Sequence, residues 1–102
     1  MIFPNDYGVA EAIPRDRGER REIAVLIWSP ISGRAFPVMF QILDENREIK
    51  TFKRLRPNLT TKREYAGIIY YEFDCNVMVE GLNVNVLMQF FPDSMKWYLL
   101  EI

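Results

Sequence analysis

Two carboxylates, Glu72 and Asp74, are the first side chains in this sequence whose spacing could support chemistry. They lie two residues apart in a stretch of alternating polar and apolar residues, so both project from one face of a predicted strand, about 6.5–7 Å apart. Such a pair could transfer protons or hold a hard cation. However, the chain has no histidine, and neither a third ligand nor a glycine-rich loop accompanies the pair. A solvated outer face of a sheet is the favoured interpretation.

Cys75 is the only cysteine of the chain, so neither an internal disulfide nor a CxxC site can form. A thiol becomes a nucleophile when a base or a cation lies beside it. The alternation places Cys75 instead on the apolar face, together with Phe73, Val77 and Val86, and this indicates a buried, unreactive thiol. We therefore expect no catalytic residue, no metal site and no cofactor, and a protein that is not an enzyme.

The charged side chains are distributed unevenly. Residues 47–63 carry seven basic side chains and one acidic one, whereas residues 64–102 carry one basic and six acidic side chains. Cations around an aromatic ring are typical of surfaces that bind single-stranded nucleic acid, because they neutralise phosphates while a base stacks. By parity, one side of a predicted strand presents Lys50, Phe52, Arg54 and Arg56. The complete nucleic-acid-binding hypothesis adds Lys53, Lys62 and Arg63. In the alternative interpretation, the cations protect an edge strand from pairing with other chains.

A second candidate surface consists of apolar residues on the nominally polar face of the C-terminal hairpin: Tyr70, Leu87, Phe91 and Tyr98. Apolar residues on both faces of a hairpin indicate that something covers part of the outer face. The cover could be the N-terminal arm or a second copy of the chain. This pattern predicts a homodimer or a docking surface for a protein partner.

The elements that must position these residues are strands. Six are expected, at residues 23–28, 36–43, 48–56, 69–79, 82–90 and 95–102. Residues 58–66 are expected to form a loop, with capping-box spacing for one helical turn at residues 61–64. Prolines and glycines break any period in residues 1–21, which predicts a loosely held arm before a single β domain at residues 22–102.

The C-terminal hairpin carries the clearest signal, because Glu80-Gly81 offers a two-residue turn between two alternating segments. Its register pairs apolar residues with apolar residues, and a slip by one residue would place them against polar ones. The five predicted pairs are Val79–Leu82, Val77–Val84, Cys75–Val86, Phe73–Met88 and Tyr71–Phe90. Glu80 is an unusual first turn residue, because the position requires positive φ. For the last strand, two-residue and three-residue loops both give acceptable pairs.

Short connections between six strands predict an all-β fold, an antiparallel meander curled into a partly closed barrel or roll. Several segments carry a resemblance: Ser32–Phe40, Asp44–Asn46, Ile49–Leu55, Cys75, Glu80-Gly81 and Lys96–Leu99. With these segments the chain resembles a group of small, uncharacterised bacterial β-domain proteins over roughly residues 22–102. The resemblance implies a small β fold and no activity.

A length of 102 residues suits one domain, and a net charge of −1 argues against a dedicated DNA-coating protein. The chain has no apolar run long enough to span a membrane and no signal-peptide pattern, and its single cysteine suits a reducing compartment. We therefore expect a cytoplasmic protein without a membrane role. The sequence predicts a non-enzymatic binding or interaction module that self-associates or binds a partner through the apolar patch. A small nucleic-acid-binding β domain is the alternative.

Overall fold

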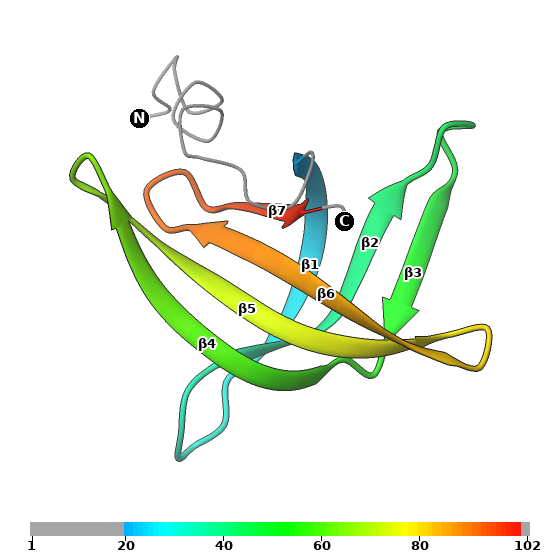
Figure 1. Ribbon diagram of the computed structural model, residues 1–102, viewed down its shortest axis with the longest axis horizontal. Coiled ribbons are helices and arrows are strands. Elements are labelled where there is room, and N and C mark those ends of the chain that lie inside the picture. The colour runs from blue at the N-terminus through cyan, green and yellow to red at the C-terminus, as the bar shows by residue number, and fades with distance from the viewer. Residues whose placement is uncertain (1–19, 101–102) are drawn as a thin grey trace.

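The chain folds into one antiparallel β-sheet, which a computed structural model describes for residues 20–100 (Figure 1). Its strands are β1 (Arg20–Trp28), β2 (Phe36–Leu43), β3 (Ile49–Lys53), β4 (Arg56–Tyr65), β5 (Ile68–Val79), β6 (Leu82–Phe91) and β7 (Lys96–Leu100). Within this range no helix is long and apolar enough to cross a membrane. The all-β antiparallel class is confirmed, whereas the predicted number of six strands is wrong, because the sheet has seven.

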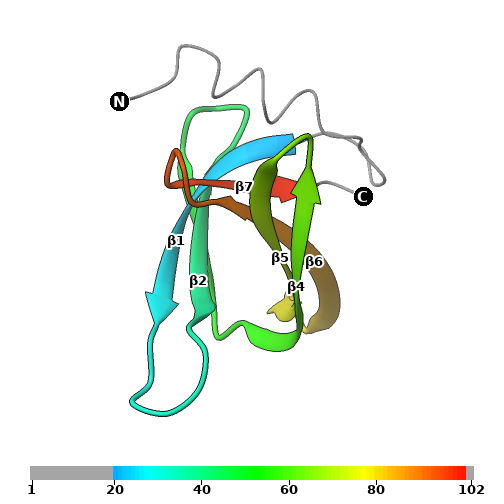
Figure 2. The same cartoon turned by 90° about the vertical axis from the view of Figure 1, so that its left-hand side faces the viewer.

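The sheet order is β3-β2-β1-β7-β6-β5-β4. β1 divides its length between two partners: its first residues pair with β7, from Arg20↔Leu100 to Ile23↔Trp97, and the rest pair with β2. Arg20 and Arg21 thus belong to the sheet, while the other residues predicted as an arm lie outside the described range. Consecutive strands β3 and β4 do not pair and form the two edges. The sheet stays open between them. Figure 2 shows how strongly the strands curl.

The opening between β3 and β4 begins at Arg54 and Leu55. Arg54 has a φ of 59°, a conformation that residues with a Cβ atom rarely adopt, and the chain leaves the line of β3 there. The Leu55 side chain enters the interior, where it is 6% exposed, and its N–H donates a 3.1 Å hydrogen bond to the Val38 carbonyl. The prediction of one strand over residues 48–56 is therefore wrong, because the chain changes direction inside that range.

The predicted loop at residues 58–66, with its helical turn, is also wrong, because residues 58–65 belong to the strand β4. β4 pairs with β5 from Arg56↔Asn76 to Tyr65↔Ile68. As an edge strand it is held on one side only, and most of its residues are exposed. Backbone pairing rather than apolar burial holds β4 in place, so hydrophobic periodicity does not reveal it.

The predicted register of the β5–β6 hairpin is confirmed in all its pairs, from Val79↔Leu82 to Tyr71↔Phe90. Glu80 and Gly81 form the two-residue turn with φ values of 51° and 81°. Positive φ at both central positions characterises the type I′ turn, whose twist matches that of the flanking strands. Glu80 therefore holds a conformation that costs free energy for any residue with a Cβ atom.

The connection between β6 and β7 is longer than either loop length that the pattern allowed. Phe91 pairs with Lys96, so residues 92–95 form the turn, and Met95 has a φ of 58°. This register places the Trp97 ring beside Phe90, with ring centroids 4.7 Å apart. The last strand therefore contributes an aromatic side chain to the interior.

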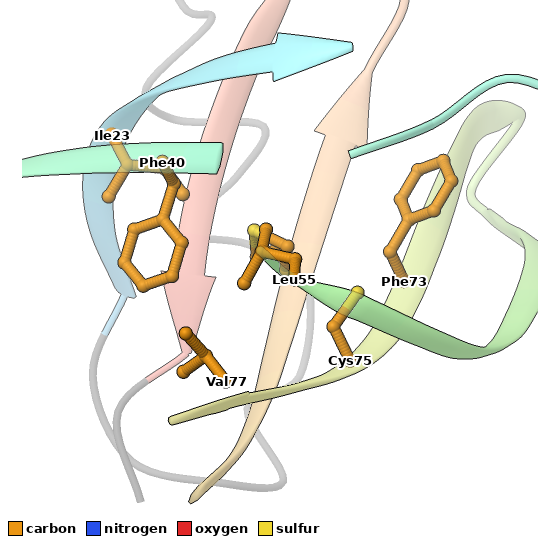
Figure 3. Close-up of a cluster of buried hydrophobic side chains, with 7 residues drawn as sticks. Ile23, Phe40, Leu55, Phe73, Cys75 and Val77 are labelled. Atoms are coloured by element: carbon orange, nitrogen blue, oxygen red, sulfur yellow. The ribbon is translucent and has the colours of Figure 1, made fainter. Parts of the chain in front are cut away.

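The main core fills the inner side of the curled sheet (Figure 3). Phe40 and Phe52 stack across β2 and β3, with ring centroids 4.8 Å apart. The Phe73 ring contacts Trp97 at 5.2 Å. The fully assembled core draws on both halves of the chain, and its buried members are Ile23, Phe40, Leu55, Phe73, Cys75, Val77 and Met88.

We expect Glu80→Asn to raise the free energy of unfolding by about 0.5–1 kcal/mol, because asparagine tolerates positive φ better than glutamate does. Urea denaturation measures the change. Glu80→Gln is the matched control: it removes the same charge without relieving the backbone conformation, and we expect it to change stability by less than about 0.5 kcal/mol. Equal effects of the two substitutions would show that charge, not φ, matters at this turn.

Candidate functional site

The first candidate carboxylate, Glu72, belongs to a row of polar side chains across the outer face of the sheet. Gln89, only 1% exposed, donates from Nε2 to Glu72 Oε2 over 2.9 Å, and its Oε1 accepts a 2.9 Å hydrogen bond from Arg20 Nε. Arg63 Nε donates to the other Glu72 oxygen over 2.5 Å. The row joins β1, β6, β5 and β4, and it accounts for both Glu72 oxygens. Glu72 therefore has a clear structural role.

Asp74, the second candidate carboxylate, is likewise engaged with neighbouring strands. Its Oδ1 accepts hydrogen bonds from Asn58 Nδ2 at 3.1 Å and from Asn85 Nδ2 at 2.6 Å. Among residues 20–100, no group of three or more histidine, cysteine or acidic side chains could hold a metal ion. The spacing of Glu72 and Asp74 therefore serves the sheet in this structure.

Cys75 lies in the main core with no exposed surface. Burial raises the pKa of its thiol to about 11, and the neighbouring Asp74 carboxylate contributes to this increase. The thiolate, which is the reactive form, is therefore scarce at neutral pH. This environment is the opposite of the one that activates a nucleophilic cysteine.

The predicted apolar patch forms a small cluster of its own on the outer face. Tyr70 stacks on Phe91 with ring centroids 5.0 Å apart, and Phe91 meets Tyr98 edge to face at 5.7 Å. These three rings are buried, with Ile68 packed against them, whereas Leu87 is half-buried. The four residues thus do not form an exposed apolar surface in this structure.

The predicted nucleic-acid-binding residues lie on β3, on β4 or at the junction between them, which are the two edges of the sheet. Phe52 stacks on Phe40 and packs against the core, so its ring is not free to stack on a base. The predicted common side for Lys50, Phe52, Arg54 and Arg56 is wrong, because the chain turns at Arg54. Placement on both edges fits the alternative interpretation, that cations protect edge strands.

The individual cations have different surroundings. Lys50 lies 3.9 Å from Asp44, and Arg63 pairs with Glu72. Lys62 shares a cleft with residues of the inner face. The remaining three are exposed near the junction: Lys53, Arg54 and Arg56. Only this last group retains the character of the predicted basic surface.

The end of the β5–β6 hairpin is an apolar surface that sequence reasoning did not recognise. β4 pairs with β5 only as far as Asn76, and β7 pairs with β6 only as far as Leu87. Within the described range, residues 77–86 therefore form a two-stranded ribbon beyond the sheet, which we call the hairpin ribbon. Its exposed apolar residues include Leu82 at 68% and Val84 at 37%. The alternation of apolar and polar residues predicted that Leu82 and Val84 are buried. They are exposed because the neighbouring strands end before this part of the hairpin, which the pattern does not show.

A cleft of about 470 Å³ opens on the inner side, between the segment that precedes β2 and the middle of β4. Three aromatic rings line it, and so do two cationic side chains from different segments: Arg34, Ala35, Thr60, Lys62, Tyr71, Phe73 and Phe90. Sequence reasoning assigned Arg34 only to a turn. No local spacing links Arg34 to Lys62, so only the fold brings the two cations to one cleft.

Compared with known proteins, the chain matches no family model, no curated protein and no solved structure. The resemblance to small bacterial β-domain proteins stays a prediction. What the protein does must therefore be inferred from its own residues.

We expect the protein to lose stability as the pH rises from about 9 to about 11. In this range the unfolded thiol of Cys75 releases its proton near its ordinary pKa of 9.0, while the folded thiol keeps its proton until about 11. The unfolded state is thereby favoured, by up to about 2 kcal/mol. Urea denaturation at several pH values measures the loss. Cys75→Ala is the comparison, because it removes the thiol and keeps every other ionisable side chain, and parallel pH profiles of the two proteins would contradict the assignment.

Proposed function

We propose that this protein is a non-enzymatic binding module that self-associates through the hairpin ribbon. The observation that carries the proposal is the ribbon itself: two strands extend beyond the sheet with exposed apolar side chains and no described strand on either edge. Leu82 and Val84 are the exposed members of its inner face, on which Val77 is buried and Val79 packs against the main core. A second copy offers an identical ribbon, so the contact is self-complementary.

Charge distinguishes the hairpin ribbon from the edges of the sheet. An edge with free backbone groups is a template for strand pairing, and proteins discourage such pairing with cations. β3 and β4 carry such cations, among them Lys53, Arg56 and Lys62, whereas residues 77–86 contain a single charged residue, Glu80. A two-stranded ribbon is also marginally stable alone in water. Contact with a second ribbon would remove Leu82 and Val84 from water and stabilise both.

The absence of an activity is part of the proposal. The Glu72 and Asp74 carboxylates are engaged in hydrogen bonds, and the Cys75 thiol is buried with a raised pKa. These groups hold the sheet together instead of presenting reactive atoms to a substrate. A single buried thiol also suits a reducing compartment, and on this ground we propose a cytoplasmic location.

Sedimentation velocity over a concentration series tests self-association. We expect the wild type to dimerise and Leu82→Lys to weaken the dimer at least about a hundredfold, because each of the two copies loses a buried leucine contact. Val84→Lys should act in the same direction. Asn83→Lys is the matched control, because it adds the same charge on the opposite face of the hairpin ribbon. A monomeric wild type at every concentration, or equal dissociation by Asn83→Lys, would overturn the proposal.

Single-stranded nucleic-acid binding is the second candidate function, and one observation favours it. Lys53, Arg54 and Arg56 are exposed together where β3 passes into β4. Three cations within four residues could neutralise neighbouring phosphates of one nucleic-acid strand. Because Phe52 is packed in the core, this contact would be electrostatic and without a stacking ring at the junction.

Fluorescence anisotropy with labelled single-stranded DNA and RNA checks this second candidate. If it holds, affinity falls steeply between about 50 and about 200 mM salt and is lost in the double variant Arg54→Glu/Arg56→Glu. The double variant Arg47→Glu/Lys50→Glu changes the net charge equally at the other end of β3 and should retain binding. The absence of binding at low salt would leave the edge cations with their protective role alone.

A further inference from the structure

The cleft on the inner side has the composition of a site for a flat, negatively charged ligand. We propose that it binds a nucleotide, with the base against the aromatic residues and the phosphate between Arg34 and Lys62. The inference is independent of self-association, which uses the opposite end of the β5–β6 hairpin, and of the cations at the β3–β4 junction.

The aromatic floor of the cleft is fixed by the sheet. Cross-strand pairing aligns Lys62 with Tyr71, Tyr71 with Phe90, and Phe90 with Trp97, so these side chains follow one another across four strands. The Phe90 and Trp97 ring centroids are 4.7 Å apart, and this contact supports Phe90 from the neighbouring strand. Tyr71 and Phe90 are only half-buried. Aromatic side chains that are partly exposed and held by the sheet in this way are suited to stacking a base.

The two cations reach the cleft from opposite sides, since Arg34 precedes β2 and Lys62 lies in the middle of β4. Both are exposed, and no carboxylate within the described range lies within ion-pair distance of either. Arg34 can bind phosphate oxygens in a bidentate manner, while Lys62 supplies a point charge. Glu64 lies two residues beyond Lys62 on the same face of β4 and is the acidic residue nearest to Lys62 in sequence. Because the cleft itself is lined by two cationic residues and no acidic one, it favours an anionic ligand.

The dimensions and hydrogen-bonding groups favour a nucleotide over a larger partner. A volume of about 470 Å³ is in the range of small-molecule sites, roughly 300–1,000 Å³, and too small for a protein segment with its own fold. Thr60, which pairs with Phe73 and lies two residues before Lys62, adds a hydroxyl-bearing side chain to the lining that could contact a ribose. The cleft lies beside the edge strand β4. The nucleotide could therefore be free, or it could be one unit of a single-stranded nucleic acid.

Isothermal titration calorimetry with AMP, adenosine, inorganic phosphate and a short oligoadenylate tests the inference on the full chain. We expect AMP to bind at least about tenfold more tightly than adenosine or phosphate alone, because only AMP engages both the rings and the cations. Oligoadenylate serves as the comparison for a longer ligand: if it binds more tightly than AMP and is weakened by the same cleft variants, the site is supported and its ligand is single-stranded nucleic acid. Absence of heat and of chemical-shift changes at Tyr71 and Phe90 up to millimolar AMP would overturn the proposal.

Variants locate the site. Arg34→Glu and Lys62→Glu should each weaken AMP binding at least about tenfold, and Tyr71→Leu should weaken it while preserving an apolar contact with Phe90. Arg47→Glu is the matched control, with the same charge reversal in the turn between β2 and β3, outside the cleft, and it should leave AMP binding unchanged. If Arg47→Glu weakens binding as much as Lys62→Glu, general electrostatic attraction explains the affinity and the cleft is not the site. Thermal unfolding verifies that each variant remains folded.

Discussion

The architecture depends on the change of direction at Arg54 and Leu55. Arg54 adopts a positive φ, and Leu55 fixes the turn by burying its side chain and donating its N–H to Val38. Because of this junction β3 and β4 diverge instead of pairing, and each becomes an edge. The open side of the sheet, the cleft beside β4 and the separation of the basic residues all follow from it. A hairpin at this place would have paired the two edges and closed the sheet into a barrel.

Different interactions stabilise the two faces of the sheet. The inner face relies on apolar contacts around Phe40, Phe73 and Met88. On the outer face, Gln89 connects Arg20 with Glu72, and the aromatic cluster lies beside this row. Buried polar groups are tolerated only when they are hydrogen-bonded, so the row must be complete to be stable. This requirement explains why polar side chains with catalytic spacing serve the fold.

Sequence patterns predicted the fold where burial alternates and failed where it does not. The β5–β6 register was predictable because Phe73, Cys75 and Val77 alternate with polar residues, so one face alone can be buried. β4 escaped prediction because its exposed residues carry no apolar period. Arg54 and Arg56 were placed on the side of Phe52 because parity was extended through Arg54, where φ changes sign. The cleft and the hairpin ribbon arise from the order of the strands in the sheet and from where each strand ends relative to its neighbours. The residue pattern of a single strand contains no such information.

The pairing of β1 with β7 has a consequence for how the protein is made. Arg20 pairs with Leu100, so the first described strand finds its second partner only when the last has left the ribosome. Until then no strand pairing links β1 to the β5–β6 hairpin. Such non-local pairing slows folding, because the entropy of closing a long loop is lost before contacts form. During synthesis the two halves of the sheet therefore stay unjoined until β7 is available, and unpaired strand edges are exposed in that interval.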